Sequence, residues 1–265
     1  MIDIIKAHQE YYSNLYRHRE LIWILAKRDL VARYKGSVLG FLWTFLNPLL
    51  LMLTYTLVFR SISRFDIPNY PLFVLQGILI WQTFAACVNE GASSLIAAGG
   101  LVTKTPLPPE VIPAKVVISQ GLNLIFAFLV YLVFAFFVFK RFSVSLVTVP
   151  LVFISVILFC AYVASVLSVV SALFKDVQQL VGNILTILFF ATPVVYSFET
   201  MPDKVKKLLL LNPLTHIFRF TTDVIFWGKM PQGSALLVFL VSLVFVQLSA
   251  VFFTSWYRRR LVENI

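Results

Sequence analysis

Charged residues are scarce in this chain: Asp, Glu, Lys and Arg make up 13% of its 265 residues. A soluble globular domain carries about twice that share. Hydrophobic residues make up 60%, and the mean hydropathy is +0.89. The composition therefore excludes an ordinary soluble domain and predicts an integral membrane protein. The formal net charge of +10 does not indicate nucleic-acid binding, because the cations stand beside apolar runs, where lipid headgroups and topology rules explain them.

Residues for several kinds of chemistry are also missing. Both cysteines, Cys87 and Cys160, fall inside apolar runs, which argues against a disulfide framework. No G-x-x-x-x-G-K-[ST] motif occurs, so the chain cannot bind ATP through a P-loop. The histidines His8, His18 and His216 have no Cys or carboxylate at metal-ligand spacing and form no Ser-His-Asp set. We expect no catalytic residue, no metal and no cofactor in this chain.

Long apolar runs are what the sequence has instead. A helix needs about 20 apolar residues to cross about 30 Å of hydrocarbon. No run shows the alternation of a barrel strand, and backbone groups in lipid must be satisfied within the segment. The sequence therefore predicts a single all-α membrane domain, residues 1–265, with six transmembrane helices. They are expected at about 38–59, 71–97, 114–139, 144–173, 177–196 and 234–256.

The distribution of Lys and Arg predicts the orientation. Six spans place both termini on one side of the membrane. That side carries 13 of the 22 Lys and Arg residues and the other side carries nine. Cytoplasmic loops hold the excess of such cations, so we expect both termini in the cytoplasm.

Two further apolar segments do not read as spans. Residues 15–34 contain six charged residues between Arg17 and Asp29, which predicts an amphipathic helix at the inner interface. Residues 197–230 hold two short apolar pieces, near 204–211 and 214–227, separated by Asn212–Pro213. Each piece is too short to span and the proline breaks the helix. We expect a pair of re-entrant helices on the outer side, between spans five and six.

Polar and aromatic residues form stripes on the first and fifth expected spans, at spacings that place them on one helical face. Aromatic rings match the apolar C–H faces of sugars, while amides bind hydroxyl groups. The same stripes also suit packing between helices, and the sequence leaves both interpretations open. The candidates for a surface that contacts sugars or water, here termed the glycan-path residues, are Trp43, Asn47 and Thr54 on the first span and Asn183, Thr186 and Phe190 on the fifth.

Few ionisable residues lie close to the spans. Arg33 and Lys35 precede the first span, and fit either phosphate ligands at an entrance or anchors at the lipid headgroups. Glu90 is the only acid well inside a span. It lies about 27 Å along its helix, near the inner interface, which disfavours ion coupling at the bilayer centre.

The loop between the second and third expected spans, "GGLVTKTPLPPEVIPAK" (99–115), contains four prolines and is moderately apolar. This composition suits a short element that contacts a soluble partner, although a rigid turn explains it as well. The candidate contact residues are Thr103, Lys104, Pro106, Leu107, Pro108, Pro109 and Glu110.

Four segments together resemble one family. "RDLVARYKGSVLGFLWTFLNPLL" (28–50), "KTPLPPEVIPAK" (104–115), "FKDVQQLVGNILTILFFATPVVY" (174–196) and "LLLNPLTHIFRF" (209–220) resemble ABC-2 type permeases that export O antigen, teichoic acid and related polymers. The resemblance covers nearly the whole chain in order.

The resemblance implies a homodimer in the bacterial plasma (inner) membrane, joined by two copies of an ABC ATPase that binds ATP and Mg. It implies that the 99–115 loop couples to that ATPase. It also implies a lateral entrance between spans one and five for an undecaprenyl-type lipid-linked polysaccharide, with Arg33 and Lys35 near the pyrophosphate. Two other functions remain open: export of a small lipid or drug by the same architecture, and a membrane glycosyl- or phospho-transferase. The transferase would need its acids among Asp29, Glu90, Glu110 and Asp176.

Overall fold

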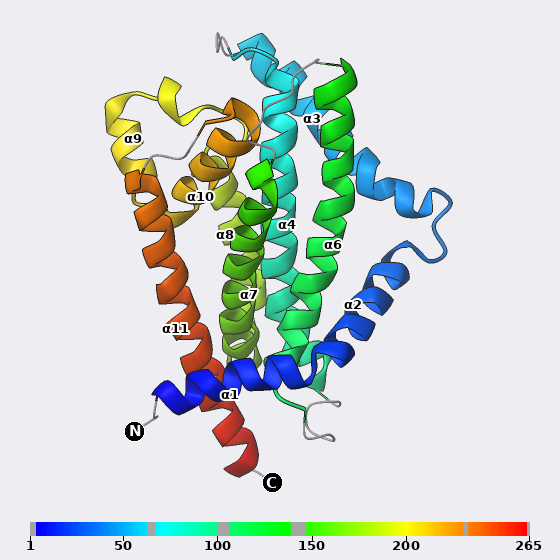
Figure 1. Cartoon of the computed structure of the whole chain (residues 1–265), viewed down its shortest axis with the longest axis vertical. Helices are drawn as coiled ribbons and strands as arrows, with labels where there is room; N and C mark the ends of the chain where they lie inside the picture. Colours follow the sequence, from blue (N-terminus) through cyan, green and yellow to red (C-terminus); the bar gives the residue numbers. More distant parts are fainter. Residues whose placement is uncertain (1–3, 63–66, 100–106, 139–146, 230–232, 264–265) are drawn as a thin grey trace.

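The computed structural model describes residues 4–62, 67–99, 107–138, 147–229 and 233–263, and every regular element in these ranges is a helix. Five helices in this part of the chain are long and apolar enough to cross a membrane. They stand side by side as a bundle (Figure 1). They are α3 (Trp43–Ile62), which follows the short η1 (Gly40–Leu42); α4 (Tyr70–Ala97); α6 (Val111–Val133), which continues into the π-helical η2 (Phe134–Val138); α7 (Val149–Leu173); and α11 (Gly233–Glu263).

The expected fifth span is shorter than the sequence predicts. Helix α8 (Asp176–Phe190) has 15 residues, about 22 Å at 1.5 Å per residue, and turns follow it through Tyr196. Pro193 explains the early end, because a proline disfavours helical backbone in the residue before it. The Asn212 amide donates to the Ala191 carbonyl at 2.9 Å and so binds one of the acceptors left free. The count of six full-length spans is therefore not confirmed: the described residues hold five candidate spans and one shorter apolar helix.

Helix α4 lies at the centre of the bundle, with most of its residues buried. Its small residues allow close approach. A Cβ atom added to Gly91 would lie 2.6 Å from the Ala164 Cβ on α7, and one added to Gly77 would lie 2.1 Å from the Val194 carbonyl oxygen. The position of α4 against α7 therefore depends on the absence of a side chain at Gly91.

The N-terminal region forms two helices where the sequence predicts one over 15–34. Helix α1 (Ile4–Arg17) lies across one end of the bundle, and α2 (Arg19–Tyr34) rises beside α6 (Figure 1). The sequence-based boundary missed α1 because its bundle-facing side is made of small and aromatic residues. Tyr11 is buried and its hydroxyl lies 3.1 Å from the Ser165 Oγ of α7.

The pair of short helices predicted within 197–230 is confirmed as two helices with a break at Asn212–Pro213. They are α9 (Asp203–Leu209) and α10 (Pro213–Thr222), preceded by η4 (Phe198–Thr200) and continued by the π-helical η5 (Asp223–Trp227). The Asn212 side chain caps α10 by accepting from the Leu214 N–H at 3.0 Å. The pair lies at the end of the bundle opposite both termini (Figure 1). Its depth in a membrane stays a prediction.

Candidate functional site

A cavity of about 750 Å³ lies among α3, α4, α6 and α8, with the end of α2 at its border. Its lining residues Trp43 on α3 and Phe190 on α8 are exposed, so the cavity is open to the surface along these two helices. This volume falls within the range of about 300–1,000 Å³ that is usual for ligand sites. The cavity is thus large enough to be a binding site, and one of its sides is open.

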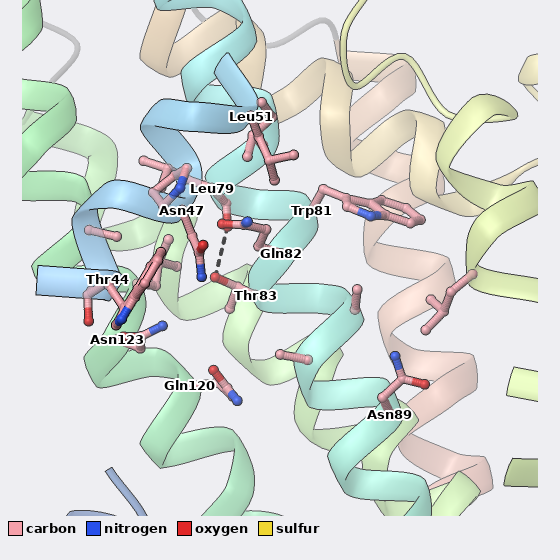
Figure 2. Close-up of a pocket in the computed structure, with 18 of the residues that line it drawn as sticks. Thr44, Asn47, Leu51, Leu79, Trp81, Gln82, Thr83, Asn89, Gln120 and Asn123 are labelled. Atoms are coloured by element: carbon pink, nitrogen blue, oxygen red, sulfur yellow. Dashed lines mark hydrogen bonds between the residues drawn. The ribbon is translucent and has the colours of Figure 1, made fainter. Parts of the chain in front are cut away.

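Apart from Arg33, the polar side chains of the lining are neutral. Figure 2 shows amide side chains from three helices around the same space. Thr44, Thr83 and Thr186 add hydroxyl groups, and none of the described lining residues is Asp or Glu. Amides both donate and accept hydrogen bonds, so this surface suits a neutral molecule with many hydroxyl groups. The amide residues are Asn47 on α3, Gln82 and Asn89 on α4, and Gln120 and Asn123 on α6.

Aromatic rings form another part of the lining. Phe189 on α8 contacts Tyr55 on α3 and Trp81 on α4, with both centroid distances 5.4 Å, and its ring lies 5.1 Å from that of Phe190. Tyr34 and Trp43 also line the cavity. Rings beside amides offer an apolar face and polar groups to one ligand, the combination that the stripes on the sequence predict.

A charged cluster stands at the border of the cavity. Arg33, near the end of α2, donates through Nη2 to both carboxylate oxygens of Glu90, each at 3.0 Å. Its Nη1 donates to Gln120 Oε1 at 3.1 Å, and Gln120 Nε2 donates to Glu90 Oε1 at 2.8 Å. Arg33 and Gln120 also line the cavity. The three side chains therefore close a ring of hydrogen bonds that joins α2, α4 and α6.

Two contacts on either side of Arg33 hold α2 against α6. Asp29 forms an ion pair with Lys115. The Tyr34 hydroxyl donates to Asn123 Oδ1 at 2.9 Å and accepts from the Thr44 hydroxyl at 2.6 Å. The backbone at Arg33 is thus fixed on both sides, and its guanidinium group is placed at the cavity border.

Four of the six predicted glycan-path residues line the cavity, namely Trp43, Asn47, Thr186 and Phe190. Thr54 and Asn183 are exposed and lie outside the lining. Of the two predicted phosphate ligands, Arg33 lines the cavity and Lys35 is exposed beyond it. The structure brings these stripes of α3 and α8 together around one space, but contact with a glycan stays a prediction for every residue of the set.

The proposed ATPase-contacting loop is described only in part. Thr103, Lys104 and Pro106 lie outside the described residues. Leu107 and Pro108 are half-buried and Pro109 is buried. Glu110 is also buried, and it faces α1 and α11 rather than solvent. Its Oε1 accepts from Asn14 at 2.9 Å and from Arg258 at 2.6 Å. Burial raises the pKa of the Glu110 carboxyl, and the Arg258 charge opposes this shift.

The sequence-based analysis missed the polar face contributed by α4 and α6. Gln82 and Asn89 are seven residues apart and Gln120 and Asn123 three residues apart, spacings that place each pair on one helical face. That periodic signal was present in the sequence. The partner of Glu90 was missed too, because Arg33 lies 57 residues away along the chain.

Residues 20–226 of the chain match the model of a protein family, the ABC-2 type transporters. This chain is a member of the ABC-2 type transporter family. The resemblance found in its sequence motifs is therefore confirmed, and the protein is an integral membrane transporter subunit. The first candidate span and α8, between which the resemblance implies an entrance, both border the cavity of this ABC-2 protein.

Three known transport proteins are similar in sequence to most of this ABC-2 chain. The O-antigen export system permease protein RfbA of Myxococcus xanthus is 35% identical over 95% of this chain and 97% of its own length. A protein of the same name from Klebsiella pneumoniae is 29% identical over 86% of each chain. The polysialic acid transport protein KpsM of Escherichia coli is 23% identical over 79% of this chain and 82% of its own.

Proposed function

We propose that this chain is the membrane-spanning permease subunit of an ATP-driven exporter, and that it moves a lipid-linked polysaccharide such as O antigen outward across the bacterial inner membrane. The observation that carries the proposal is the cavity open between α3 and α8, which is lined by amides and aromatic rings and by no described carboxylate. The names of the relatives, which include an O-antigen export system permease protein and a polysialic acid transport protein, support the same substrate class.

In this proposal energy comes from another subunit. The sequence contains no P-loop, so two copies of an ABC ATPase would bind ATP and Mg and press on the loop that ends at Glu110. Both termini lie at the end of the bundle where α4 ends and α6 begins (Figure 1). This end would face the cytoplasm, and the α9–α10 pair would face outward.

A second copy of the chain completes the proposed path. Exposed apolar residues cover α8, among them Leu180, Ile184 and Ile187, and the neighbouring face of α3 exposes Leu50 and Leu53. A homodimer that brings these helices near its axis would enclose the open side of each cavity. The glycan would then pass between rings and amides, with the carrier's pyrophosphate near Arg33 and the carrier chain in the lipid.

Deletion of the gene in its own host tests the proposal. We expect loss of surface glycan, accumulation of lipid-linked glycan in the inner membrane and unchanged drug tolerance, all restored by the wild-type chain. Normal surface glycan with reduced drug tolerance would instead indicate a small-molecule exporter.

Reconstitution with the cognate ATPase tests the energy source. The wild-type complex should hydrolyse ATP, and removal of residues 103–107, which leaves the buried Glu110 in place, should uncouple hydrolysis from glycan transport. ATP hydrolysis by the purified chain alone would contradict the proposed division of roles.

A further inference from the structure

We propose that Glu90 is an internal anion that occupies the phosphate site of Arg33 and Gln120, and that the phosphate group of a prenyl pyrophosphate displaces it. This inference rests on the proposed function and goes beyond it. It identifies Gln120 as the second hydrogen-bond donor of the phosphate site. It also identifies Glu90 as an internal competitor, whose carboxylate occupies this site until the phosphate of the substrate displaces it.

The geometry of donors carries the inference. Arg33 Nη2 and Gln120 Nε2 both point at the Glu90 carboxylate, at 3.0 and 2.8 Å. A phosphate group also offers negatively charged oxygens, which accept from the same guanidinium and amide N–H donors. If a phosphate took the place of the carboxylate, it would therefore meet both donors without any change in their positions.

Orientation of the Gln120 side chain adds a second argument. Its carbonyl oxygen accepts from Arg33 Nη1 at 3.1 Å, so its NH₂ group is turned toward the anion position. Gln120 is buried, and it has no freedom to turn its amide toward bulk solvent. The donor would remain aimed at that position after Glu90 had left.

Exposure makes the exchange feasible. The side chains of Arg33 and Glu90 are 30% and 44% exposed, so water and solutes reach the pair. A partly exposed ion pair is weak, since screening and side-chain entropy offset most of the attraction. The released Glu90 carboxylate would be solvated rather than buried without a partner.

The surrounding contacts confine the exchange to side chains. Asp29 and Tyr34 hold α2 to α6 on both sides of Arg33. The guanidinium group therefore keeps its place when Glu90 leaves. A bound pyrophosphate would lie at the cavity border, with the attached glycan beside the neutral amides.

Binding of farnesyl diphosphate to the full-length chain in phosphatidylcholine nanodiscs tests the inference. In Glu90→Gln the competing charge is absent but the side-chain shape is retained, so the Kd should fall about two- to fivefold, the range that a partly exposed ion pair implies. Arg33→Lys and Gln120→Leu should each raise the Kd. Glu20→Gln removes one charge from an exposed position of α2, and should leave the Kd unchanged.

Different probes separate the sources of the phosphate. Farnesol, which has no phosphate, should not bind at this site. If inorganic pyrophosphate shows the same gain in Glu90→Gln, the exchange site is supported and needs no lipid chain. If phosphatidylglycerol nanodiscs abolish the effect, bulk headgroups fill the site and a role specific to the carrier is wrong.

An unchanged Kd in a folded Glu90→Gln protein would overturn the inference. If that variant only loses thermal stability, the ion pair serves to hold the helices together and does not compete with phosphate. Failure of the proposed function is distinguishable. In that case deletion of the gene would leave surface glycan intact, while the effect of Glu90→Gln on diphosphate binding would persist.

Discussion

Removal of the Arg258 side chain should destabilise the protein more than loss of charge at Glu110 does. Arg258 bonds the fully buried Glu110 through Nη2 and the exposed Glu10 through Nη1, at 2.6 and 2.9 Å. In Arg258→Ala the buried carboxylate loses its cationic partner and keeps the hydrogen bond from the Asn14 amide at 2.9 Å. Loss of one member of a buried ion pair costs about 3–5 kcal/mol of unfolding free energy.

The reciprocal variant should be milder. In Glu110→Gln the Asn14 contact can persist, and Arg258 retains Glu10 and partial exposure to solvent. A lost hydrogen bond to a charged group costs about 1.5–3 kcal/mol. The double variant Arg258→Ala with Glu110→Gln should recover part of the loss, because no buried charge is left.

The effect of pH gives an independent check. Burial raises the pKa of Glu110, while the charge of Arg258 and the hydrogen bond from Asn14 lower it. Without Arg258 the pKa of Glu110 in the folded protein rises further above the unfolded value. Ionisation of Glu110 then costs folding free energy at neutral pH. This cost falls as the pH drops through the folded-state pKa and is gone below the unfolded-state value. Relative to wild type, Arg258→Ala should therefore lose less stability at acidic pH than at neutral pH.

Thermal or denaturant unfolding in nanodiscs measures these differences. Arg259→Ala removes an exposed arginine from the next position of α11 and is the matched control. If Arg258→Ala is no less stable than Arg259→Ala, or if the Glu110 variant is the less stable of the two, the buried pair does not hold α1, α6 and α11 together.

Three further predictions concern the bundle and the cavity. Gly91→Leu should prevent folding, because its Cβ atom would lie 2.6 Å from that of Ala164. Gly182→Leu is the control and should fold, since no atom lies within 4 Å of the added Cβ. The yield of monodisperse protein measures the difference between the two variants. Asn212→Ala should lower the unfolding free energy by about 1–2 kcal/mol, because the α10 cap and the hydrogen bond to Ala191 are both lost. Leu211→Ala, at an exposed neighbouring position, is the control. Trp43→Ala should reduce glycan export with the folded protein intact, whereas Trp23→Ala, at an exposed position of α2 outside the lining, should not. Equal effects on surface glycan would contradict the placement of the path.

The sequence predicted those parts of the fold that depend on local composition. Hydropathy located the five candidate spans within a few residues, and Pro213 located the break between α9 and α10. It misjudged the end of α8, because residues 191–196 are as apolar as the helix before them. Whether such a run continues as a helix depends on Pro193 and on tertiary bonds such as that from Asn212 to Ala191. A hydropathy profile records neither the proline effect nor the tertiary hydrogen bond.

The cavity depends on how helices are placed relative to each other, and a periodic pattern does not give that placement. Helical spacing marks the faces that hold Asn47, Gln82 and Asn123. Their convergence requires α4 to sit where Gly91 lets it approach α7, and α2 to be tied to α6 by Asp29 and Tyr34. The same placement brings Arg33 to Glu90. Glu90, for which the sequence predicts no partner, thus neutralises the charge of Arg33 at the cavity border. The other polar side chains of the described lining are uncharged. Such a surface can offer hydrogen bonds to successive sugar units without holding any one of them by charge.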